Sequence, residues 1–308
     1  MSIQEKQEVD ILKSGSRAHM GERTFSDRLF RLFNFLFLGF VSVATLYPFW
    51  YICVGSISSM NHIYTSKILL WPDGFSLAAY RHVLNNPGIP RAFGNSIFIV
   101  IVGTALSMLL TTIGAYVLSK PYLPGRKYMT LFIVITMLFN GGLIPFYLTL
   151  RWLHLIDTIW VLIVPTAIST YNMILMRNFL MSVPSALEES AQMDGAGHFT
   201  TLFKIYIPLS KPVLATVTLF YAVGNWNAFF NAIVFLNKPD YQPIQVLLRE
   251  VLVMNRADLL IFEDFRLNAP TEIVKMALVV VTILPIIMIY PFLQKYFVKG
   301  VMMGSIKG

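Results

Sequence analysis

The residues best suited to chemistry lie in a polar segment that separates two long apolar stretches of the chain. Glu188, Glu189 and Asp194 gather in this segment. Carboxylates exposed to water can form ion pairs and hydrogen bonds with a charged partner. Basic side chains are few here, with only Lys204 and Lys211, so a helix resting on anionic lipid headgroups fits less well. We therefore interpret the segment as a docking site for another protein.

No catalytic or nucleotide-binding signature accompanies this segment. The phosphate-loop pattern G-x-x-x-x-G-K-[ST] is absent from the sequence, so the chain is not expected to bind or hydrolyse ATP. The five histidines show neither H-x-x-E-H nor H-E-x-x-H spacing. The single cysteine, Cys53, permits no intrachain disulfide. We predict no catalytic residue, no metal site and no cofactor bound by this chain.

Two short helices joined at a glycine are predicted within the polar segment. The run from Ser185 to Glu188 has the S-x-x-E form of a capping box, which predicts a helix from near Ala186. Gly195 can adopt a positive φ, as the ends of helices often require. A second helical stretch is expected over His198–Ile205, ending before Pro208.

The surrounding chain has the composition of an integral membrane protein. Of its 308 residues, 56% are hydrophobic and only 13% are charged, whereas soluble domains have about 25% charged residues. Crossing the ~30 Å hydrocarbon core takes about 20 helical residues, and a helix satisfies its own backbone there. The apolar runs of sufficient length are Leu32–Ile57, Ile97–Leu118, Tyr128–Leu150, Ile159–Leu180, Val213–Leu236 and Val274–Phe297. We predict an all-α integral membrane fold with six transmembrane helices.

These runs form one membrane domain with a short tail at each end. The predicted parts are an N-terminal segment, 1–28, a six-span domain, 29–300, and a tail, 301–308. Two longer connections stand out within the domain. The polar segment occupies 182–211, and a second polar loop occupies 237–271.

The net charge of +8 is better explained by membrane topology than by binding of nucleic acid. Basic residues concentrate in the N-terminal segment, in the C-terminal tail and in the 120–127 connection, which contains no acidic residue. Because basic residues mark the cytoplasmic side of a membrane, both termini and the 182–211 segment are expected in the cytoplasm. The 237–271 loop is then extracytoplasmic.

Four of the predicted spans contain helix-breaking residues. They are Pro48 in the first span, Asn140-Gly141-Gly142 and Pro145 in the third, Pro165 in the fourth, and Pro285 and Pro291 in the sixth. Broken helices occur in membranes where the freed backbone faces protein or a water-filled cavity, and they are common in transporters. Proline is, however, more frequent in membrane helices generally.

Residues of the 182–211 segment follow the pattern E-A-A-x-x-D-G-A and then I-x-L-P. The matching positions are Glu189, Ala191, Asp194, Gly195, Ala196, Ile205 and Pro208. Ser190 and Ile207 stand where Ala and Leu are usual. This pattern resembles the EAA loop of permease subunits of bacterial ABC importers. The run Gly94-Asn95-Ser96-Ile97 and the ending Tyr296–Gly300 are similar to the second permease of maltose-type carbohydrate importers.

The resemblance implies a type I ABC importer permease fold and a role for the segment. In that family the EAA loop is a coupling helix that seats in a groove of a cytosolic ATPase. Closure of the ATP-bound ATPase dimer then switches the spans from inward-facing to outward-facing. Glu189 would make charged contacts at the rim of the groove, and Gly195 would permit the turn. The implied coupling residues are Glu188, Glu189, Ala191, Asp194, Gly195, Ala196, Ile205 and Pro208.

The resemblance also implies a set of partners in a bacterial cell membrane. These are a homologous second permease, two ATPase subunits that hold ATP and Mg²⁺, an extracytoplasmic solute-binding protein, and an oligosaccharide substrate. Nucleic acid is not expected to bind. The sequence leaves open whether the sugar is neutral or acidic.

Amide and aromatic side chains at membrane depth are candidates for a sugar path. Amides can bind hydroxyl groups, and rings can cover the apolar face of a pyranose. Asn227 and Asn231 are four positions apart, so one helix would present them on one face. The alternative is hydrogen bonding between helices. The candidates are Tyr221, Asn225, Trp226, Asn227, Asn231, Asn140 and Asn172.

The 237–271 loop resembles the periplasmic loop with which this permease class reaches into the opened solute-binding protein. Asn255 and Arg256 are expected near its tip. The alternative is a solvated loop that faces the binding protein without entering it.

Three other functions are alternatives to this one. An ABC permease for a non-sugar solute remains open, although the tail and loop fit it less well. A secondary transporter would need coupling groups at mid-membrane and usually shows repeat symmetry. A membrane-embedded enzyme would need acids, histidines or a metal cluster within the spans, which contain almost none.

Overall fold

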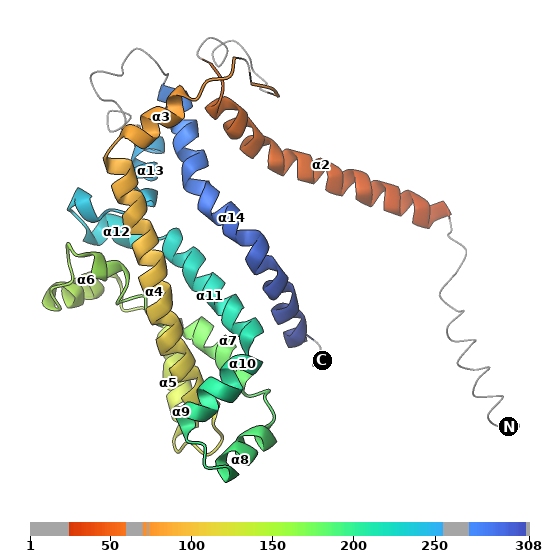
Figure 1. Cartoon of the computed structure of the whole chain (residues 1–308), viewed down its shortest axis with the longest axis vertical. Coiled ribbons are helices and arrows are strands. Elements are labelled where there is room, and N and C mark those ends of the chain that lie inside the picture. Colours follow the sequence, from red (N-terminus) through yellow and green to blue (C-terminus); the bar gives the residue numbers. More distant parts are fainter. Residues whose placement is uncertain (1–24, 60–69, 73, 255–270, 306–308) are drawn as a thin grey trace, which may run out of the picture. The chain divides into compact units, whose positions relative to one another are not determined.

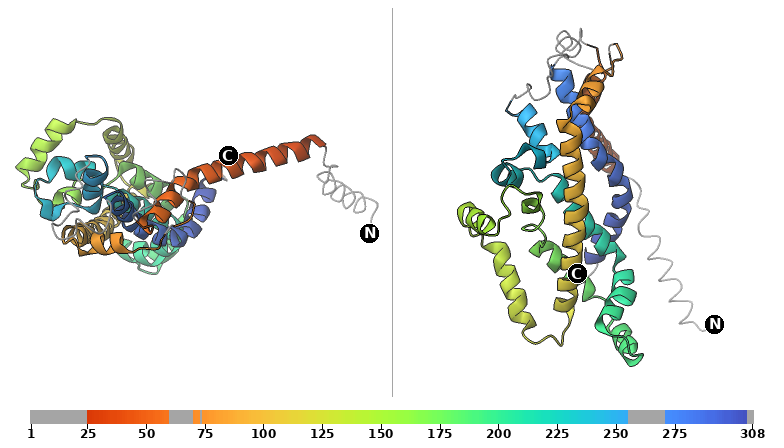
Figure 2. Two further views of the ribbon diagram at one scale, coloured as in Figure 1. Left: turned by 90° about the horizontal axis from the view of Figure 1, so that it is seen from above. Right: turned by 60° about the vertical axis from the view of Figure 1, so that its left-hand side comes forward.

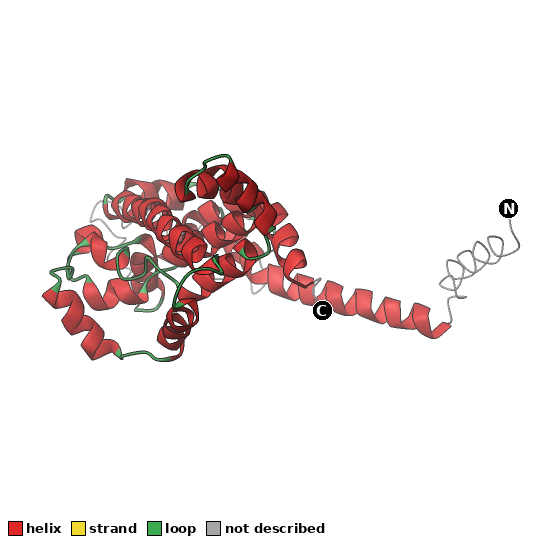
Figure 3. Cartoon of the chain, turned by 90° about the horizontal axis from the view of Figure 1, so that it is seen from below, coloured by secondary structure: helices red, strands yellow, loops and turns green. Residues whose placement is uncertain are grey.

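A computed structural model describes residues 25–59, 70–72, 74–254 and 271–305. All regular elements in these ranges are helical, apart from an isolated bridge between Ser58 and Phe75 (Figure 1). Figure 3 shows the same chain as helices joined by loops. The elements are α2 Phe25–Ser56, α3 Ala78–Asn85, α4 Gly88–Ser119, α5 Arg126–Leu138, α6 Leu143–Trp152, η1 Ile159–Leu162, α7 Thr170–Leu180, α8 Ser185–Met193, α9 His198–Thr201, η2 Leu202–Tyr206, α10 Ile207–Leu209, α11 Lys211–Trp226, α12 Phe230–Phe235, η3 Pro239–Tyr241, α13 Ile244–Leu252 and α14 Thr271–Ser305.

The chain divides into two compact units, Met1–Ile52 and Cys53–Gly308. The first unit contains all of α2 except its last turn. This helix covers nearly all of the predicted first span, Leu32–Ile57. Its length and apolar composition are sufficient to cross a membrane.

Within the second unit, α4 is the helix around which the others pack. It makes its most extensive contacts with α11 and α7, and α11 also packs against α14. Figure 2 shows α4 running along the length of this unit. At one end of α4 lie α3 and α13, and at the other end lie α8 and α9 (Figure 1).

Close packing between α4 and α11 follows from small and hydroxyl residues on α4. Thr104, Ser107 and Thr111 are buried there. A Cβ added at Gly103 would lie 2.9 Å from Nδ2 of Asn225 on α11. Small residues of this kind let two membrane helices approach closely. The sequence of α4 therefore sets the separation of the two helices.

The described residues of the second unit form three hydrophobic clusters, and α4 contributes to each of them. Ile89 belongs to the cluster formed with α13 and α14. Ile99 belongs to the cluster that contains η1 and α12. Ala115 and Tyr116 belong to the cluster that contains α7, η2 and α11. A displacement of α4 would therefore reach all three clusters.

Among the residues that the structure describes, three helices are long and apolar enough to cross a membrane, or up to five when each sharply bent pair counts as one span. The three are Arg28–Ser56, Gly88–Ser119 and Glu272–Ile289. One bent pair is α5 with α6, at 113°, and the other joins His198–Leu209 to α11, at 85°. The fold is thus helical and of membrane type, as predicted, but it does not display six continuous spans.

Three of the predicted spans are interrupted, two of them at the helix-breaking residues expected there and the third, Val213–Leu236, where no break was predicted. Tyr128–Leu150 breaks between α5 and α6, where Gly142 takes a φ of +86°. Ile159–Leu180 is a short 3₁₀ turn, then non-helical backbone, then α7. Pro165 lies in that gap, and it lacks the N–H that a continuing helix would need. The Asn140-Gly-Gly and Pro165 breaks therefore occur where the sequence indicated them.

The third interruption separates α11 from α12. The predicted span Val213–Leu236 ends its first helix at Trp226, and Asn227 is the C-cap residue. Asparagine favours helix ends because its side chain competes with the backbone for hydrogen bonds. The chain resumes a helix only at Phe230.

Candidate functional site

The polar segment forms the predicted helix–glycine–helix element. Its first helix, α8, begins at Ser185, one residue before the expected position. Gly195 follows with a φ of +79°, which confirms the positive φ predicted there. The second helix extends beyond its predicted end, because α9, η2 and α10 run on from His198 to Leu209. The intervening π turn bonds the Ile207 N–H to the Leu202 carbonyl, and such turns re-route helix hydrogen bonds around irregular positions.

The capping box predicted for Ser185 and Glu188 is wrong. Pro184 is the N-cap residue of α8, and no side chain caps this helix. Proline has neither a side-chain oxygen for the helix nor an N–H for Glu188. Glu188 instead turns into the protein, where only 7% of its surface is exposed.

The buried carboxylate of Glu188 forms an ion pair with Lys120, the residue that ends α4. The Lys120 Nζ lies 2.7 Å from Oε2 of Glu188, and Lys120 is itself 4% exposed. Tyr206 donates its hydroxyl to Oε2 at 2.8 Å, and Tyr122 donates to Oε1 at 3.1 Å. A buried carboxylate is tolerated when its oxygens are satisfied in this way.

Aromatic rings enclose the ammonium of Lys120. Its Nζ lies 4.0 Å from the ring centre of Tyr116 and 3.9 Å from that of Tyr206. These two rings meet edge to face, with their centres 5.2 Å apart. A desolvated cation is attracted to the faces of such rings. We refer to Lys120, Glu188, Tyr116, Tyr122 and Tyr206 as the Lys120 cluster.

Burial lowers the pKa of Lys120 from its ordinary value, although the hydrogen bond to Glu188 and the charge of Glu188 oppose this shift. Burial by itself would raise the pKa of Glu188, but the hydrogen bonds from Lys120 and Tyr206 and the charge of Lys120 outweigh it. The pKa of Glu188 therefore lies below its ordinary value. A cation at the C-terminal end of α4 also matches the sign of the helix dipole.

The outward face of the element consists of the other predicted coupling residues and several apolar side chains. Glu189, Asp194, Gly195 and Pro208 are exposed, whereas Ala191, Ala196 and Ile205 are partly buried. Met193 is 89% exposed and Phe199 is 76% exposed. Large apolar side chains exposed on a polar element are typical of a protein interface.

Sequence reasoning placed Glu188 in the coupling set but missed Lys120, Tyr122 and Tyr206. A lysine that directly follows an apolar helix is normally interpreted as reaching toward headgroups. The contact joins residues far apart in the chain, and neither residue type nor spacing marks it. The one sequence feature that could have indicated a buried Lys120 was its position between Tyr116 and Tyr122.

Tyr221, a candidate for the sugar path, joins three helices instead of facing a cavity. Its hydroxyl lies 2.6 Å from Oγ1 of Thr111 on α4, and it accepts a hydrogen bond from the N–H of Ser169 at 2.9 Å. Ser169 is the N-cap residue of α7. Tyr221 is 6% exposed, so these contacts match the alternative of hydrogen bonding between helices.

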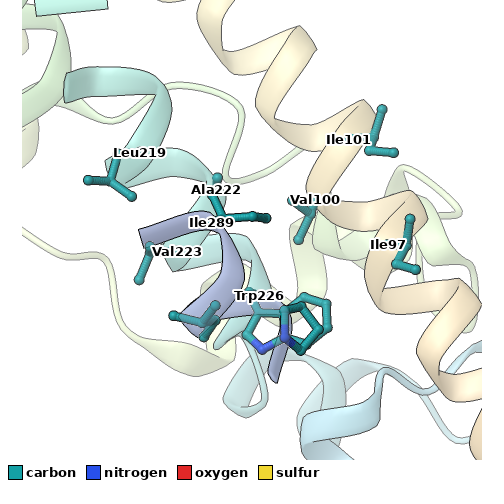
Figure 4. A pocket seen from close by; sticks show the side chains of 10 residues that line it. Ile97, Val100, Ile101, Leu219, Ala222, Val223, Trp226 and Ile289 are labelled. Carbon is teal, nitrogen blue, oxygen red and sulfur yellow. The ribbon is translucent and has the colours of Figure 1, made fainter. Parts of the chain in front are cut away.

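Asn225 and Trp226 are also engaged between helices. The Asn225 amide donates to Oγ1 of Thr104 at 3.3 Å. Trp226 is 5% exposed, and its ring meets Phe93 edge-on with centres 5.5 Å apart. Trp226 also borders an apolar cavity of about 310 Å³ between α4, α11 and α14 (Figure 4). Apart from the indole N–H of Trp226, the side chains around this cavity are apolar, so it offers few partners for sugar hydroxyls.

Asn227 and Asn231 do not share a helix, so the prediction of one common face was wrong. Asn227 ends α11 and is exposed, whereas Asn231 lies in α12 and is partly buried. The break described above separates them. The structure therefore places the two amides independently of each other.

Asn140 and Asn172 lie on two further elements. Asn140 is exposed, and its Oδ1 accepts a hydrogen bond from the N–H of Gly142 at 2.9 Å, which shapes the α5–α6 connection. Asn172 is buried in the first turn of α7, where its backbone N–H donates to Oγ of Ser169. The sugar-path candidates are thus distributed over α7, α11, α12 and the α5–α6 connection.

The described start of the 237–271 loop docks on the opposite end of α4. Arg91 pairs with Asp240, and the Asn95 amide donates to the Asp240 carbonyl at 2.7 Å. The N–H of Ile244, which begins α13, donates to Oγ of Ser96 at 2.9 Å. Asn255 and Arg256 lie outside the described residues.

Possible metal ligands were considered over the described ranges. No group of three or more His, Cys, Asp or Glu side chains that could hold a metal ion occurs in 25–59, 70–72, 74–254 and 271–305.

Known proteins similar to this chain show its family. Residues 14–303 match the family described as "Binding-protein-dependent transport system inner membrane component". Protein LplC of Bacillus subtilis (strain 168) is 42% identical, over 94% of this chain and 99% of its own. The polygalacturonan/rhamnogalacturonan transport system permease protein YtcP of the same organism is 40% identical, over 90% and 99%.

A solved structure agrees as well. It is described as a bacterial ABC transporter involved in the import of the acidic polysaccharide alginate. It is 39% identical, with a TM-score of 0.84 over 89% of this chain and 98% of the other. These similarities confirm the predicted resemblance to ABC importer permeases, whose subunits are not themselves catalytic. The chain belongs to the family of inner membrane components of binding-protein-dependent transport systems.

Proposed function

We propose that this chain forms half of the translocation path of an ATP-driven importer of acidic oligosaccharides. It would pair with a homologous second permease in the cell membrane of a bacterium. Two cytosolic ATPase subunits would hold ATP and Mg²⁺, and an extracytoplasmic solute-binding protein would deliver the sugar. Six spans with both termini in the cytoplasm fit the inside-positive distribution of Lys and Arg.

The geometry of the polar element supports its role as the ATPase-docking site. Glu188 holds α8 from within, while Glu189, Asp194 and Met193 remain exposed on the outside. An exposed apolar side chain beside a carboxylate suits a groove with an apolar floor and a basic rim. This combination of a buried attachment and an exposed face is the observation on which the coupling role rests.

An acidic oligosaccharide is the substrate class that the relatives favour. One relative, 40% identical, is named as a polygalacturonan/rhamnogalacturonan permease. The similar solved transporter is described as importing alginate. Both substrates are polymers that contain uronic acids. We extend that class, and not an individual sugar, to this chain.

The candidate residues of the sugar path are assigned different roles, according to their exposure and their hydrogen bonds. Asn227 is exposed and Asn231 is partly exposed, so both can reach a substrate or a partner permease. Tyr221 and Asn225 are already bonded between helices, so we assign them to holding the path in shape. Trp226, Asn140 and Asn172 stay candidates for the sugar path. Asn255 and Arg256 stay candidates for contact with the binding protein.

Uptake by the reconstituted complex tests the proposed function. The chain, its partner permease, the ATPase and the binding protein are placed in proteoliposomes with labelled oligogalacturonate, oligoalginate or maltotriose. We expect ATP-dependent uptake of an acidic oligosaccharide and none when the ATPase is omitted. Uptake that persists without the ATPase would contradict the importer function. ATP-dependent uptake of a non-sugar solute alone, or of maltotriose alone, would contradict the substrate class.

A matched pair of glycine variants tests the docking role. A Cβ at Gly195 or at Gly197 would meet no atom within 4 Å, but only Gly195 has a positive φ. Gly195→Ala therefore strains the turn, by about 1–2 kcal/mol, whereas Gly197→Ala does not. We expect Gly195→Ala to reduce co-purification of the ATPase, and Gly197→Ala to leave it unchanged. Equal behaviour of the two variants would argue against a docking role for this turn.

A further inference from the structure

The attachment of α8 to the rest of the protein depends on few contacts. Among the described elements, none packs extensively against α8, whereas α4 packs extensively against both α11 and α7. The hydrogen bonds that Glu188 accepts from Lys120, Tyr122 and Tyr206 all reach outside α8. A force applied to α8 thus has a defined route into the protein through one side chain.

That route leads to the end of α4. Lys120 is the C-cap residue of α4, and its backbone N–H is bonded to the Val117 carbonyl. Its ammonium is held between the rings of Tyr116, which belongs to α4, and Tyr206, which belongs to η2. Tyr116 and Tyr206 are both part of the hydrophobic cluster that includes α7 and α11. The ammonium is therefore fixed relative to α4 rather than free on a flexible stem.

An ion pair at this position has a property that apolar packing lacks. Two apolar surfaces can slide past each other at modest cost, whereas a buried charge that loses its partner is strongly destabilised. The best-supported role of buried polar groups in such positions is to fix a single register between two elements. Separating α8 from α4 would leave the Glu188 carboxylate or the Lys120 ammonium uncompensated in a buried site.

We propose that Lys120 and Glu188 are a positioning pair that makes α8 and the adjoining end of α4 move as one body. Movement of the docked ATPase is then delivered to α4, and through α4 to the three clusters of the second unit. This inference rests on the proposed function, because it requires that an ATPase docks on α8. For this role, neither residue needs to contact the substrate or the ATPase.

The inference is tested first in the complete transporter reconstituted in proteoliposomes. The variants Lys120→Met and Glu188→Gln remove one charge each while keeping much of the side-chain volume, and Lys120→Glu with Glu188→Lys exchanges the charges. Lys127→Met and Arg151→Met are matched controls, since each removes the charge of an exposed basic side chain outside the Lys120 cluster. Both ATP hydrolysis and sugar uptake are measured, and their ratio is the readout.

We expect each single variant to hydrolyse ATP while the sugar imported per ATP falls about tenfold, within the usual range of coupling between sites. The charge exchange should restore part of that ratio, and the controls should leave it unchanged. A merely structural role would lower hydrolysis and uptake together, with an unchanged ratio, and that result would overturn the inference. If the unaltered complex shows no ATP-dependent uptake at all, the proposed function fails instead.

A distance measurement that leaves Lys120 and Glu188 unchanged tests the inference even if the single variants do not assemble into a transporter. Cys53→Ser removes the only cysteine, and spin labels are then placed at Ser190→Cys on α8 and Val117→Cys on α4. Both positions are exposed. The distance between the labels should be the same in the nucleotide-free and the ATP-trapped transporter. A distance that changes between these two states would overturn the inference.

Discussion

The two ends of α4 each form an ion pair with a distant segment, and the two pairs differ in burial. At one end, Lys120 meets Glu188 with side chains that are 5% and 9% exposed. At the other end, Arg91 meets Asp240 with side chains that are 63% and 70% exposed. The first pair lies among three tyrosines, whereas the second lies in contact with solvent. The same helix thus has one end fixed by buried charges and one end that water can reach.

This difference suggests a division of tasks along α4. Removing one partner from a buried pair costs about 3–5 kcal/mol, because the other charge is left uncompensated. An exposed pair contributes only about 0–1 kcal/mol, because water and salt screen it. A rigid end suits the transmission of force from an ATPase. In the proposed importer, an end that rearranges easily would suit the loop that we propose to meet and release the binding protein.

The largest expected effect is at the buried end. Glu188→Ala should lower the free energy of unfolding by about 3–5 kcal/mol, because the Lys120 ammonium loses its counterion. Glu189→Ala, on the exposed side of the same helix, is the matched control and should change it by less than about 0.5 kcal/mol. Denaturant titration of the protein in detergent measures both. Similar values for the two variants would remove the distinction between the buried and exposed carboxylates.

Acidification should weaken the buried end in a predictable direction. Because the folded-state pKa of Glu188 lies below its ordinary value of 4.5, its stabilisation is complete above that value. The stabilisation is lost as the pH falls through the lower, folded-state pKa. The difference in stability between the unaltered protein and Glu188→Ala should therefore shrink on acidification below pH 4.5. A difference that grows on acidification would contradict an ionised Glu188.

A smaller effect is expected from a single hydroxyl in the Lys120 cluster. Tyr206→Phe removes the 2.8 Å hydrogen bond that the Tyr206 hydroxyl donates to the Glu188 carboxylate, and Tyr206 is only 4% exposed. We expect a loss of about 1–2 kcal/mol in the free energy of unfolding, as for hydrogen bonds to charged groups. Tyr122→Phe removes a longer bond from an exposed residue and should cost less. The reverse order would show that burial does not govern these contributions.

The smallest effect is expected at the exposed end. Arg91→Ala should lower the free energy of unfolding by no more than about 1 kcal/mol, and salt should reduce even that difference, since exposed pairs are screened. Titrations at low and high ionic strength measure this. A loss as large as that of Glu188→Ala would erase the contrast between the two ends of α4.

The parts of the structure that were predictable from sequence are the local ones. Gly195 lies between two short segments predicted to be helical, so it indicated a turn between two helices. Its φ of +79° agrees. The apolar runs correctly located α2, α4 and α14. These features depend on residue type and near neighbours, which a sequence displays directly.

The long-range contacts were not predictable in the same way. Ser185 and Glu188 have the spacing of a capping box, but Glu188 pairs with Lys120, whose buried position arises only when α4 and α8 meet. Similarly, Asn227 and Asn231 have helical spacing, but the chain leaves the helix between them. In the first case tertiary structure overrode a local pattern. In the second, the preference of asparagine for helix ends overrode the helical spacing.

A double-mutant cycle on each ion pair tests most directly the contrast between the buried and the exposed end of α4. The free energy of unfolding is measured for Lys120→Met, Glu188→Gln and the double variant, and for Arg91→Met, Asp240→Asn and their double variant. We predict a coupling energy of about 2–3 kcal/mol between Lys120 and Glu188, and less than about 0.5 kcal/mol between Arg91 and Asp240. Equal coupling energies for the two pairs would contradict the assignment of Lys120 and Glu188 as the fixed connection between α8 and α4.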